Sequence, residues 1–241
     1  MTEAIISDLR QLGVAVRYQV QSYLRTYRFL ALVILTILIV TILFVVLYEV
    51  VTPTTVVANN QGPANFLDTS IGFVSDLVFL SAALLGGDAI STDFGARTGY
   101  YTLVLPIRRR VLLLGRSLGA WASACAIVVV YYVGESLTTA YFFGGLPGAA
   151  LVGSLGLAFL YCAAAVALAF FFSSVVKTPA FSIVLTFVLL FIALPIIDTV
   201  IALSSNVEPW FSLSYAGGIL QLPFVNHPHT TGGVAFTSYF P

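Results

Sequence analysis

The chain has 241 residues and a formal net charge of zero; 59% of its residues are hydrophobic and only 8% are charged. Charged residues make up about a quarter of an ordinary soluble domain, so this composition excludes a soluble globular protein and gives no support to nucleic-acid binding. The length allows one membrane domain of about five or six spans and leaves no room for a second sizeable soluble domain.

All ten basic residues fall in three short stretches, which long uncharged runs separate. Four arginines precede residue 29, five lie between residues 97 and 116, and Lys177 stands alone. Because Lys and Arg are retained on the cytoplasmic side of a membrane, we expect a multi-pass plasma-membrane protein with a cytoplasmic N terminus. The acidic residues in or beside the opposite loops are Glu49, Asp68, Glu135, Asp198 and Glu208.

Residues 1–28 predict an amphipathic helix that lies in the inner membrane interface. Apolar residues recur at spacings of three and four and share one helix face: Ile5, Leu9, Leu12, Val16, Val20, Leu24 and Tyr27. The arginines fall on an adjacent flank, where they can reach lipid phosphates. A soluble docking helix is the alternative, but direct attachment to a membrane span favours the interfacial position.

Five apolar stretches follow, and each has about the twenty residues that cross roughly 30 Å of hydrocarbon as a helix. They lie at 29–48, 66–87, 112–133, 149–172 and 180–201, within a transmembrane domain that covers 29–203. The predicted fold is an all-α polytopic membrane protein with an interfacial helix and five transmembrane helices. In the third span, Gly115, Gly119 and Ser123 repeat every four residues, which allows a neighbouring helix to approach closely.

Polar and helix-breaking residues define the connections between the later spans. The uncharged run from 136 to 176 is too long for one span, and Gly144–Gly148 must break it. We therefore expect a short outer or re-entrant segment at 136–143. Residues 173–179 predict a tight inner turn. Residues 204–241 are polar and contain no Lys or Arg, which indicates an extracytoplasmic loop.

The connection between the second and third spans contains a recognisable pattern. Its parts are Asp93, Arg97-Thr98-Gly99, an apolar patch, Leu105-Pro106-Ile107-Arg108-Arg109 and Leu114-Gly115-Arg116. The pattern resembles the cytoplasmic loop of type-2 ATP-binding-cassette (ABC) permeases, where an acidic residue precedes Gly-Thr, a short coupling helix follows, and Pro-x-x-Arg leads to Gly-Lys. Here Thr98-Gly99 reverses the usual order, and Arg116 replaces the usual Lys. The N-terminal helix and the order of the spans are also similar to that family.

This resemblance implies that residues 88–112 form a cytoplasmic coupling segment on which a soluble ATPase acts. The residues expected to have this role are Asp93, Arg97, Thr98, Gly99, Tyr100, Leu103, Pro106 and Arg108. Asp93 suits a helix start, and Arg97 suits an ion pair with an acidic partner. The apolar residues would form a knob on the protrusion. The alternative is a loop whose arginines only anchor it to lipid phosphates.

The chain itself has no phosphate-binding loop, because its single Lys lacks the preceding glycines. The resemblance therefore implies separate ABC ATPase subunits, which bind ATP and Mg²⁺, and a second permease chain in a homodimer. No cofactor or metal site is expected in this chain; His227 and His229 lack a third ligand and are interpreted as loop residues. Members of the family have six spans, and the sixth is not in this chain; the alternatives are that it lies beyond Pro241 in a longer native chain or that it is absent.

Asp76 falls in the middle of the second predicted span. A charged residue there costs about 2.5–3.5 kcal/mol, so Asp76 should face protein or water. It is either a contact for a cation or polar substrate in a translocation path or a packing hydrogen bond. By analogy with the family, Thr186, Phe187 and Phe191 in the fifth span are further candidates to line the path, with core packing as the alternative.

Together these features predict the permease subunit of an ABC exporter. Such a subunit couples ATP hydrolysis by a separate nucleotide-binding subunit to translocation of a substrate. The alternative is a non-transporting membrane anchor or mechanotransducing subunit that passes ATPase motion to an extracytoplasmic partner. A passive channel is a third possibility, and co-purification with an ATPase separates it from the other two.

Overall fold

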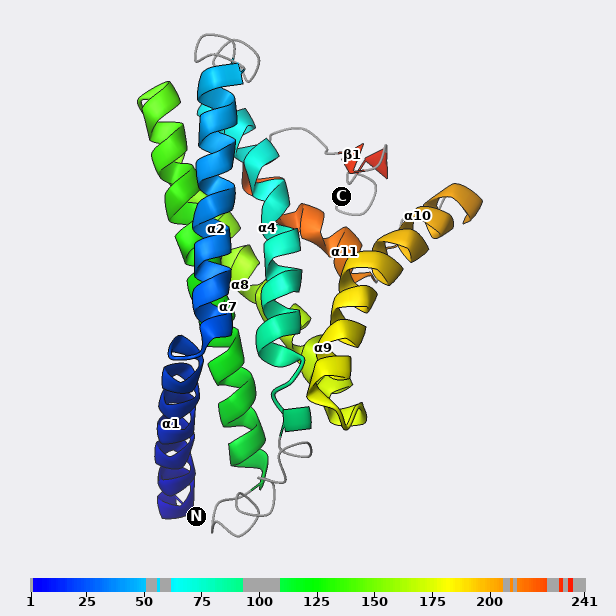
Figure 1. Cartoon of the computed structure of the whole chain (residues 1–241). Coiled ribbons are helices and arrows are strands. Elements are labelled where there is room, and N and C mark those ends of the chain that lie inside the picture. The colour runs from blue at the N-terminus through cyan, green and yellow to red at the C-terminus, as the bar shows by residue number, and fades with distance from the viewer. Residues whose placement is uncertain are drawn as a thin grey trace.

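The structure, a computed structural model, describes residues 2–50, 56, 62–92, 109–205, 209, 212–224, 230–231 and 234–235. Among these residues, five helices are long and apolar enough to cross a membrane: Tyr27–Glu49, Pro63–Gly86, Arg110–Phe143, Gly148–Val175 and Pro179–Ile201. This result confirms the five predicted spans and the all-α class. Figure 1 shows the helices gathered into one elongated bundle.

The elements follow one another in a simple order along the chain. The α-helices are α1 (Thr2–Leu24), α2 (Tyr27–Val45), α4 (Pro63–Gly86), α7 (Arg109–Phe143), α8 (Gly148–Val175), α9 (Pro179–Val188), α10 (Leu194–Ser205) and α11 (Leu213–Ala216). The shorter elements are π-helical turns at Val46–Val50 and Leu189–Ala193, 3₁₀ turns at Gly217–Leu220 and Leu222–Phe224, and the antiparallel strands β1 (Thr230–Thr231) and β2 (Val234–Ala235).

The predicted N-terminal helix is present as α1, and it runs alongside the first turns of α7 (Figure 1). A Cβ atom added at Gly115 of α7 would lie 2.6 Å from the Cβ of Ala15, and one at Gly119 would lie 2.7 Å from Gln19. The close helix approach expected at these glycines is therefore confirmed, with α1 as the partner. Of the apolar face predicted for residues 1–28, Leu24 and Tyr27 are exposed, and the interfacial position of this helix stays a prediction.

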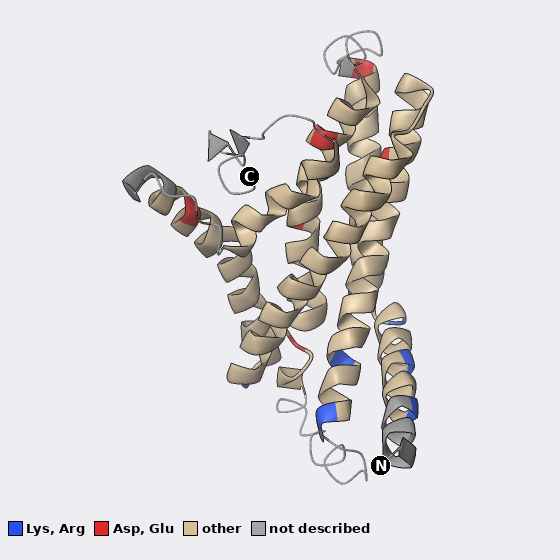
Figure 2. Ribbon diagram, turned by 180° about the vertical axis from the view of Figure 1, so that it is seen from behind, with Lys and Arg blue, Asp and Glu red and all other residues tan. Residues whose placement is uncertain are grey.

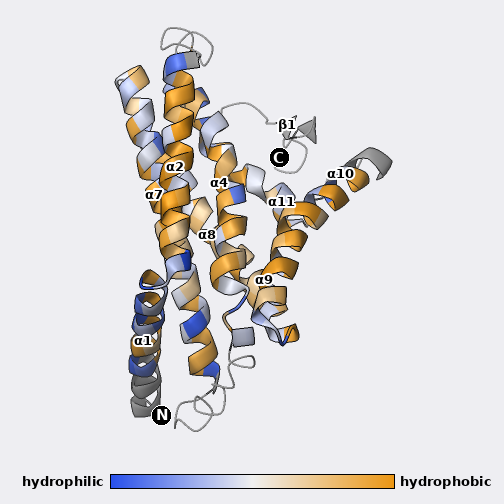
Figure 3. Cartoon of the chain, in the orientation of Figure 1, coloured by the Kyte–Doolittle hydropathy of each residue, from blue (hydrophilic) through white to orange (hydrophobic). Residues whose placement is uncertain are grey.

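The central helix of the bundle is α4. In the most apolar part of the span Pro63–Gly86, 61% of residues are buried, compared with 11% in the span Tyr27–Glu49. Ile71, Val74 and Val78 of α4 are fully shielded from solvent by the surrounding helices. By contrast, α2 presents an almost uniformly apolar surface (Figure 3), which suits lipid or a partner chain.

The third span is longer than predicted. α7 continues without interruption through residues 136–143, so the prediction of a separate outer or re-entrant segment there is wrong. These residues contain no glycine or proline, and the hydroxyls of Thr138 and Thr139 each bond to the carbonyl four residues earlier. The helix ends at the predicted break, where Gly144 adopts a φ of 68° that suits glycine.

The last span is not one regular helix. The predicted tight turn joins α8 to α9, and a π-helical turn then links α9 to α10. Pro195, near the start of α10, lacks a backbone N–H and cannot donate to the helix, which favours a change of direction at this point. Figure 1 shows α10 leaning away from the rest of the bundle.

Part of the predicted outer loop packs back onto the bundle. We call residues 212–224 the return segment. Leu220 in this segment is 1% exposed, and its carbonyl accepts a hydrogen bond from the Ser154 hydroxyl of α8 at 2.6 Å. The side-chain amide of Gln221 donates to the Asp68 carbonyl of α4 at 2.9 Å. The prediction of a polar loop missed this packed segment, and its extracytoplasmic placement stays a prediction.

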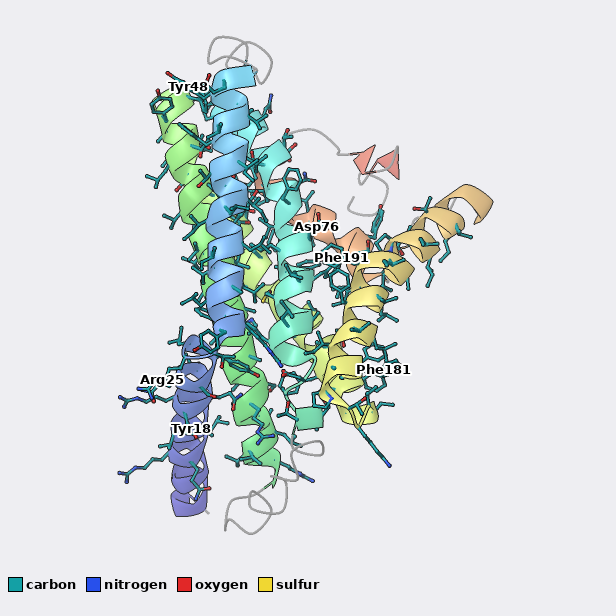
Figure 4. The ribbon with its side chains drawn as sticks, in the orientation of Figure 1. Tyr18, Arg25, Tyr48, Asp76, Phe181 and Phe191 are labelled. Atoms are coloured by element: carbon teal, nitrogen blue, oxygen red, sulfur yellow. The ribbon has the colours of Figure 1, made fainter. Side chains whose placement is uncertain are left out.

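Charge distinguishes the two ends of the bundle. Among the described residues, the basic ones lie toward the end that holds the N terminus, which we call the basic end (Figure 2). Most of the described acidic residues lie toward the other end or within the bundle (Figure 2). Arg10, Arg17 and Arg25 of the N-terminal region are exposed, and Figure 4 shows Arg25 extending away from the helices. The described residues thus retain the charge asymmetry on which the predicted topology depends.

Candidate functional site

The predicted coupling segment, residues 88–112, is described only where it joins the bundle. Its predicted site residues lie outside the described residues: Asp93, Arg97, Thr98, Gly99, Tyr100, Leu103, Pro106 and Arg108. Residues 88–92 follow α4, and residues 109–112 begin α7. The structure therefore shows how the two ends of the segment are held, and their contacts define the candidate site.

Arg28 and Asp88 form an ion pair just beyond the end of α4. The Nη1 group of Arg28, in the first turn of α2, donates to Oδ2 of Asp88. The Asp88 side chain is 13% exposed, whereas that of Arg28 is 46% exposed. Because a carboxylate this well shielded from water needs a charged partner, the pair connects α2 to the start of the coupling segment.

Two further helices supply polar side chains to the same stretch. Tyr23 of α1 donates its hydroxyl to the Leu85 carbonyl at 2.7 Å. Burial raises the pKa of Tyr23 to about 12, so the phenol stays protonated near neutral pH and remains a donor. Arg116 of α7 donates to the Ala89 carbonyl at 3.3 Å. These bonds connect both α1 and α7 to the chain that leaves α4.

Two buried serines contact this stretch from α8 and α9. The Ser173 hydroxyl accepts hydrogen bonds from the backbone N–H groups of Ile90 and Ser91 at 3.0 and 3.1 Å. The Ser182 hydroxyl donates to the Gly87 carbonyl. Both serines are completely buried, so these bonds form away from water, where an unpaired backbone group is costly.

Five helices therefore hold one short stretch of chain. We call residues 85–92, together with their contacts to Tyr23, Arg28, Arg116, Ser173 and Ser182, the junction. Most of these contacts satisfy backbone groups beyond the regular bonding of α4, so the junction is fixed relative to the helices around it. A displacement of the chain that follows residue 92 would reach all five helices through the junction.

Sequence reasoning missed most of the junction. It assigned Arg28 to lipid anchoring, and it did not single out Asp88. A signal for this pair was available, because both residues border predicted spans on the same side of the membrane and carry opposite charges. Tyr23, Ser173 and Ser182 give no comparable signal, since hydroxyl groups occur in helices with many different surroundings.

The candidate path residues lie in two different environments. Asp76 is exposed in the single chain and lies one helical turn before Phe79 on α4; Figure 4 labels Asp76 and Phe191. Phe191 stacks on Phe187 with ring centroids 4.7 Å apart, and it contacts Phe79 of α4 at 6.1 Å. Thr186 is fully buried, and its hydroxyl donates to a carbonyl of its own helix. Phe191 therefore packs against α4 at Phe79, one helical turn from Asp76, whereas Thr186 is buried and bonds within its own helix.

A second acid lies in this part of the bundle. Asp198 of α10, expected in or beside an outer loop, is 9% exposed and accepts a hydrogen bond from the Ser212 hydroxyl at 2.8 Å. The buried phenol of Tyr161 lies within electrostatic range of Asp76 and Asp198. Polar groups from α4, α8, α10 and the return segment thus occur together among apolar helices, where they need protein or water partners.

Comparison with known proteins identifies the family. The sequence matches the family described as ABC-2 family transporter protein over residues 16–213, which include the five spans and the junction. No curated protein matches the chain closely enough to count as a relative. The family is a transmembrane component of ABC transporters and partners with an ABC ATPase subunit. The chain therefore belongs to the ABC-2 transporter family and is a multi-pass permease subunit of an ABC transporter.

Proposed function

We propose that this permease belongs to an exporter and couples ATP hydrolysis in a separate nucleotide-binding subunit to translocation of a substrate. The junction is the observation that supports this proposal. A soluble ATPase that moves the coupling segment would act through residues 85–92 on five helices at once, as switching between two helix arrangements requires. The ATPase would bind ATP and Mg²⁺, and this chain would bind neither.

A second permease chain would complete the translocation path. Asp76 is exposed in the single chain, although a charged residue at mid-span costs about 2.5–3.5 kcal/mol in hydrocarbon. A two-fold related copy would cover this side chain with protein or a water-filled path. Asp76, Phe187 and Phe191 would then line the path in a homodimer. The basic end would face the cytoplasm, with the protein in the plasma membrane.

One observation favours a second candidate function, mechanical transduction without transport. α4 joins the junction at one end and contacts the return segment at Asp68 near the other end. A helix of this length spans about 36 Å, so movement of the junction would reach the return segment along one element. If the return segment lies outside the membrane, the chain would pass ATPase motion to an extracytoplasmic partner.

Co-purification and ATPase activity of the full chain test the coupling role. The tagged chain, purified from its native membrane, is expected to retain an ABC ATPase. The Arg28→Gln variant should retain the ATPase but lower its permease-dependent activity about tenfold, within the usual range of coupling energies. Arg25→Gln changes an exposed arginine three residues away and should have no effect. Absence of the ATPase, or equal effects of the two variants, would contradict the proposal.

The Asp76→Asn variant separates export from transduction. In an exporter, this change should abolish the part of the ATPase activity that solutes extracted from the native host stimulate, and it should leave the basal activity intact. In a transducer, the variant should keep its full response to an extracytoplasmic partner, and solutes should have no effect on either protein. The second result would reject export and support transduction.

A further inference from the structure

Two buried polar atoms in the middle of the bundle have no hydrogen-bond partner among the described residues. One is the hydroxyl oxygen of Tyr161 in α8, and the other is Oδ1 of Asp198 in α10. The two residues are 4% and 9% exposed. Because a buried polar atom without a partner is costly, native proteins retain few such atoms unless a function requires them. Both atoms are therefore candidates to contact a ligand.

The return segment contacts both residues. The Ser212 hydroxyl donates to Oδ2 of Asp198 at 2.8 Å, so that Oδ1 is the acceptor left without a donor. A Cβ atom added at Gly217, in the same segment, would lie 3.3 Å from the Tyr161 hydroxyl. The Tyr161 phenol also lies within electrostatic range of Asp198 and of Asp76 in α4. Three polar side chains from three helices are thus brought close to one another.

The charge of this group favours a cation. In the described part of the chain, neither Asp76 nor Asp198 forms an ion pair with Lys or Arg. The described basic residues lie toward the basic end of the bundle (Figure 2). Carboxyl groups within membrane spans are costly unless a positive charge, a polar partner or water accompanies them. A bound cation would supply such a charge to both acids.

Aromatic rings beside these acids favour an organic cation over a metal ion. Phe79 lies one helical turn after Asp76, and its ring contacts those of Tyr161 and Phe191 at centroid distances of 5.8 and 6.1 Å. Phe191 in turn stacks on Phe187, and both of these residues are partly exposed. Ring faces attract ammonium groups and pack against hydrocarbon. The described residues contain no group of three His, Cys, Asp or Glu side chains that could hold a metal ion.

We propose that Asp76, Asp198 and Tyr161 bind the ammonium group of an amphipathic organic cation, and that such cations are the substrate class of the exporter. Oδ1 of Asp198 and the Tyr161 hydroxyl oxygen accept hydrogen bonds from the ammonium, and Asp76 adds a second negative charge. The hydrocarbon part of the cation lies on Phe187 and Phe191. The assignment as substrate rests on the export proposed above, whereas binding to the chain does not.

Binding of a fluorescent amine to the full chain tests this site. Dansylcadaverine, which has a primary ammonium group, is titrated into the chain in phosphatidylcholine nanodiscs and followed by fluorescence anisotropy. Dansylamide has the same fluorophore without the ammonium group and should bind at least about tenfold more weakly. Asp198→Asn keeps an acceptor for Ser212 but loses the negative charge, and it should weaken dansylcadaverine binding about thirtyfold. The control, Glu49→Gln, changes an exposed acid at the end of the first span and should leave binding unchanged.

Tyr161→Phe distinguishes a ligand contact from a structural role. The hydroxyl that it removes has no partner among the described residues, so the unfolding temperature of the ligand-free protein should not fall. Dansylcadaverine binding should nevertheless weaken about tenfold. Unchanged binding in this variant would overturn the proposal. Equal affinities for dansylcadaverine and dansylamide, or equal losses in Asp198→Asn and Glu49→Gln, would overturn it in favour of general partition into the apolar surface.

ATPase activity of the complete transporter tests the substrate assignment separately. Dansylcadaverine should stimulate the ATPase of the complex, and Asp198→Asn should need about thirtyfold more of it for the same stimulation. Specific binding without stimulation would reject organic cations as the substrate class. If no ATPase accompanied the chain, the export proposal would fail, while the binding measurements would still decide whether the site exists.

Discussion

The two ends of α4 are held in different ways. At the basic end, polar and charged side chains from five helices hold the junction, and two of the contributing groups are completely buried serines. At the other end, neutral groups contact α4: the Gln221 amide of the return segment donates to the Asp68 carbonyl, and the Tyr131 hydroxyl of α7 donates to the Ser70 carbonyl. The difference indicates that the end proposed to receive ATPase motion resists displacement from the bundle.

The largest effect is expected for loss of the Ser173 hydroxyl. Ser173→Ala leaves the buried N–H groups of Ile90 and Ser91 without their acceptor and should lower the free energy of unfolding by about 2–4 kcal/mol. Chemical denaturation of the full chain in detergent measures this loss. The control is Ser174→Ala, an exposed serine that bonds only within α8 and should cost less than about 0.5 kcal/mol. Equal losses of unfolding free energy in the two variants would show that the junction does not depend on its contact with α8.

A somewhat smaller loss of stability is expected for a change at the contact between α1 and α7, and it tests whether α1 is packed on the bundle at the basic end. Gly115→Ala places a methyl group 2.6 Å from the Cβ of Ala15, and it should destabilise the protein by about 1–3 kcal/mol. Gly156→Ala, in α8, meets nothing within 4 Å and should stabilise the helix by up to about 1 kcal/mol. Thermal unfolding of both variants measures the difference. A neutral Gly115→Ala would mean that α1 is not firmly packed on α7.

At the other end, Ser154→Ala should have a smaller effect than Ser173→Ala. The variant removes the donor to the Leu220 carbonyl and leaves the buried Tyr132 hydroxyl without its acceptor. It should cost about 1–2 kcal/mol, because one orphaned donor is less costly than two orphaned N–H groups. The same denaturation experiment measures it, with limited proteolysis reporting release of the return segment. If Ser154→Ala lowered the free energy of unfolding more than Ser173→Ala, the end of α4 at the return segment would be the more firmly held one.

The smallest effect concerns Tyr23 and is confined to alkaline pH. The folded protein holds the pKa of Tyr23 at about 12, above the ordinary value of 10.0. The unfolded chain therefore releases this proton first, and the stability that the buried phenol contributes is complete below pH 10 and falls as pH rises toward 12. Tyr23→Phe should show a shallower loss of unfolding temperature across this window. Parallel curves for the two proteins would contradict the burial of this phenol.

The sequence predicted the positions of the helices better than it predicted the contacts between them. Uncharged length located the spans, and Gly144 correctly marked the end of a helix, because these signals are local. The extension of α7 was missed because a buried acid, Glu135, was interpreted as a loop residue, although it is 2% exposed within a regular helix. The junction was missed for a different reason. Most of its contacts join residues about 60 or more positions apart, such as Arg28 and Asp88, and no local pattern specifies them.

The length of α7 has a consequence for how a soluble partner reaches this protein. Its 35 residues span about 52 Å, whereas the hydrocarbon core is about 30 Å thick, so roughly 20 Å of helix stands clear of the acyl chains. α1 packs beside the first turns of α7, so any part of this excess that projects at the basic end would form a short two-helix stalk. A partner docking there meets protein raised above the headgroups. Bilayer thickness would then set the height of that stalk, and a thicker membrane would leave less of it accessible.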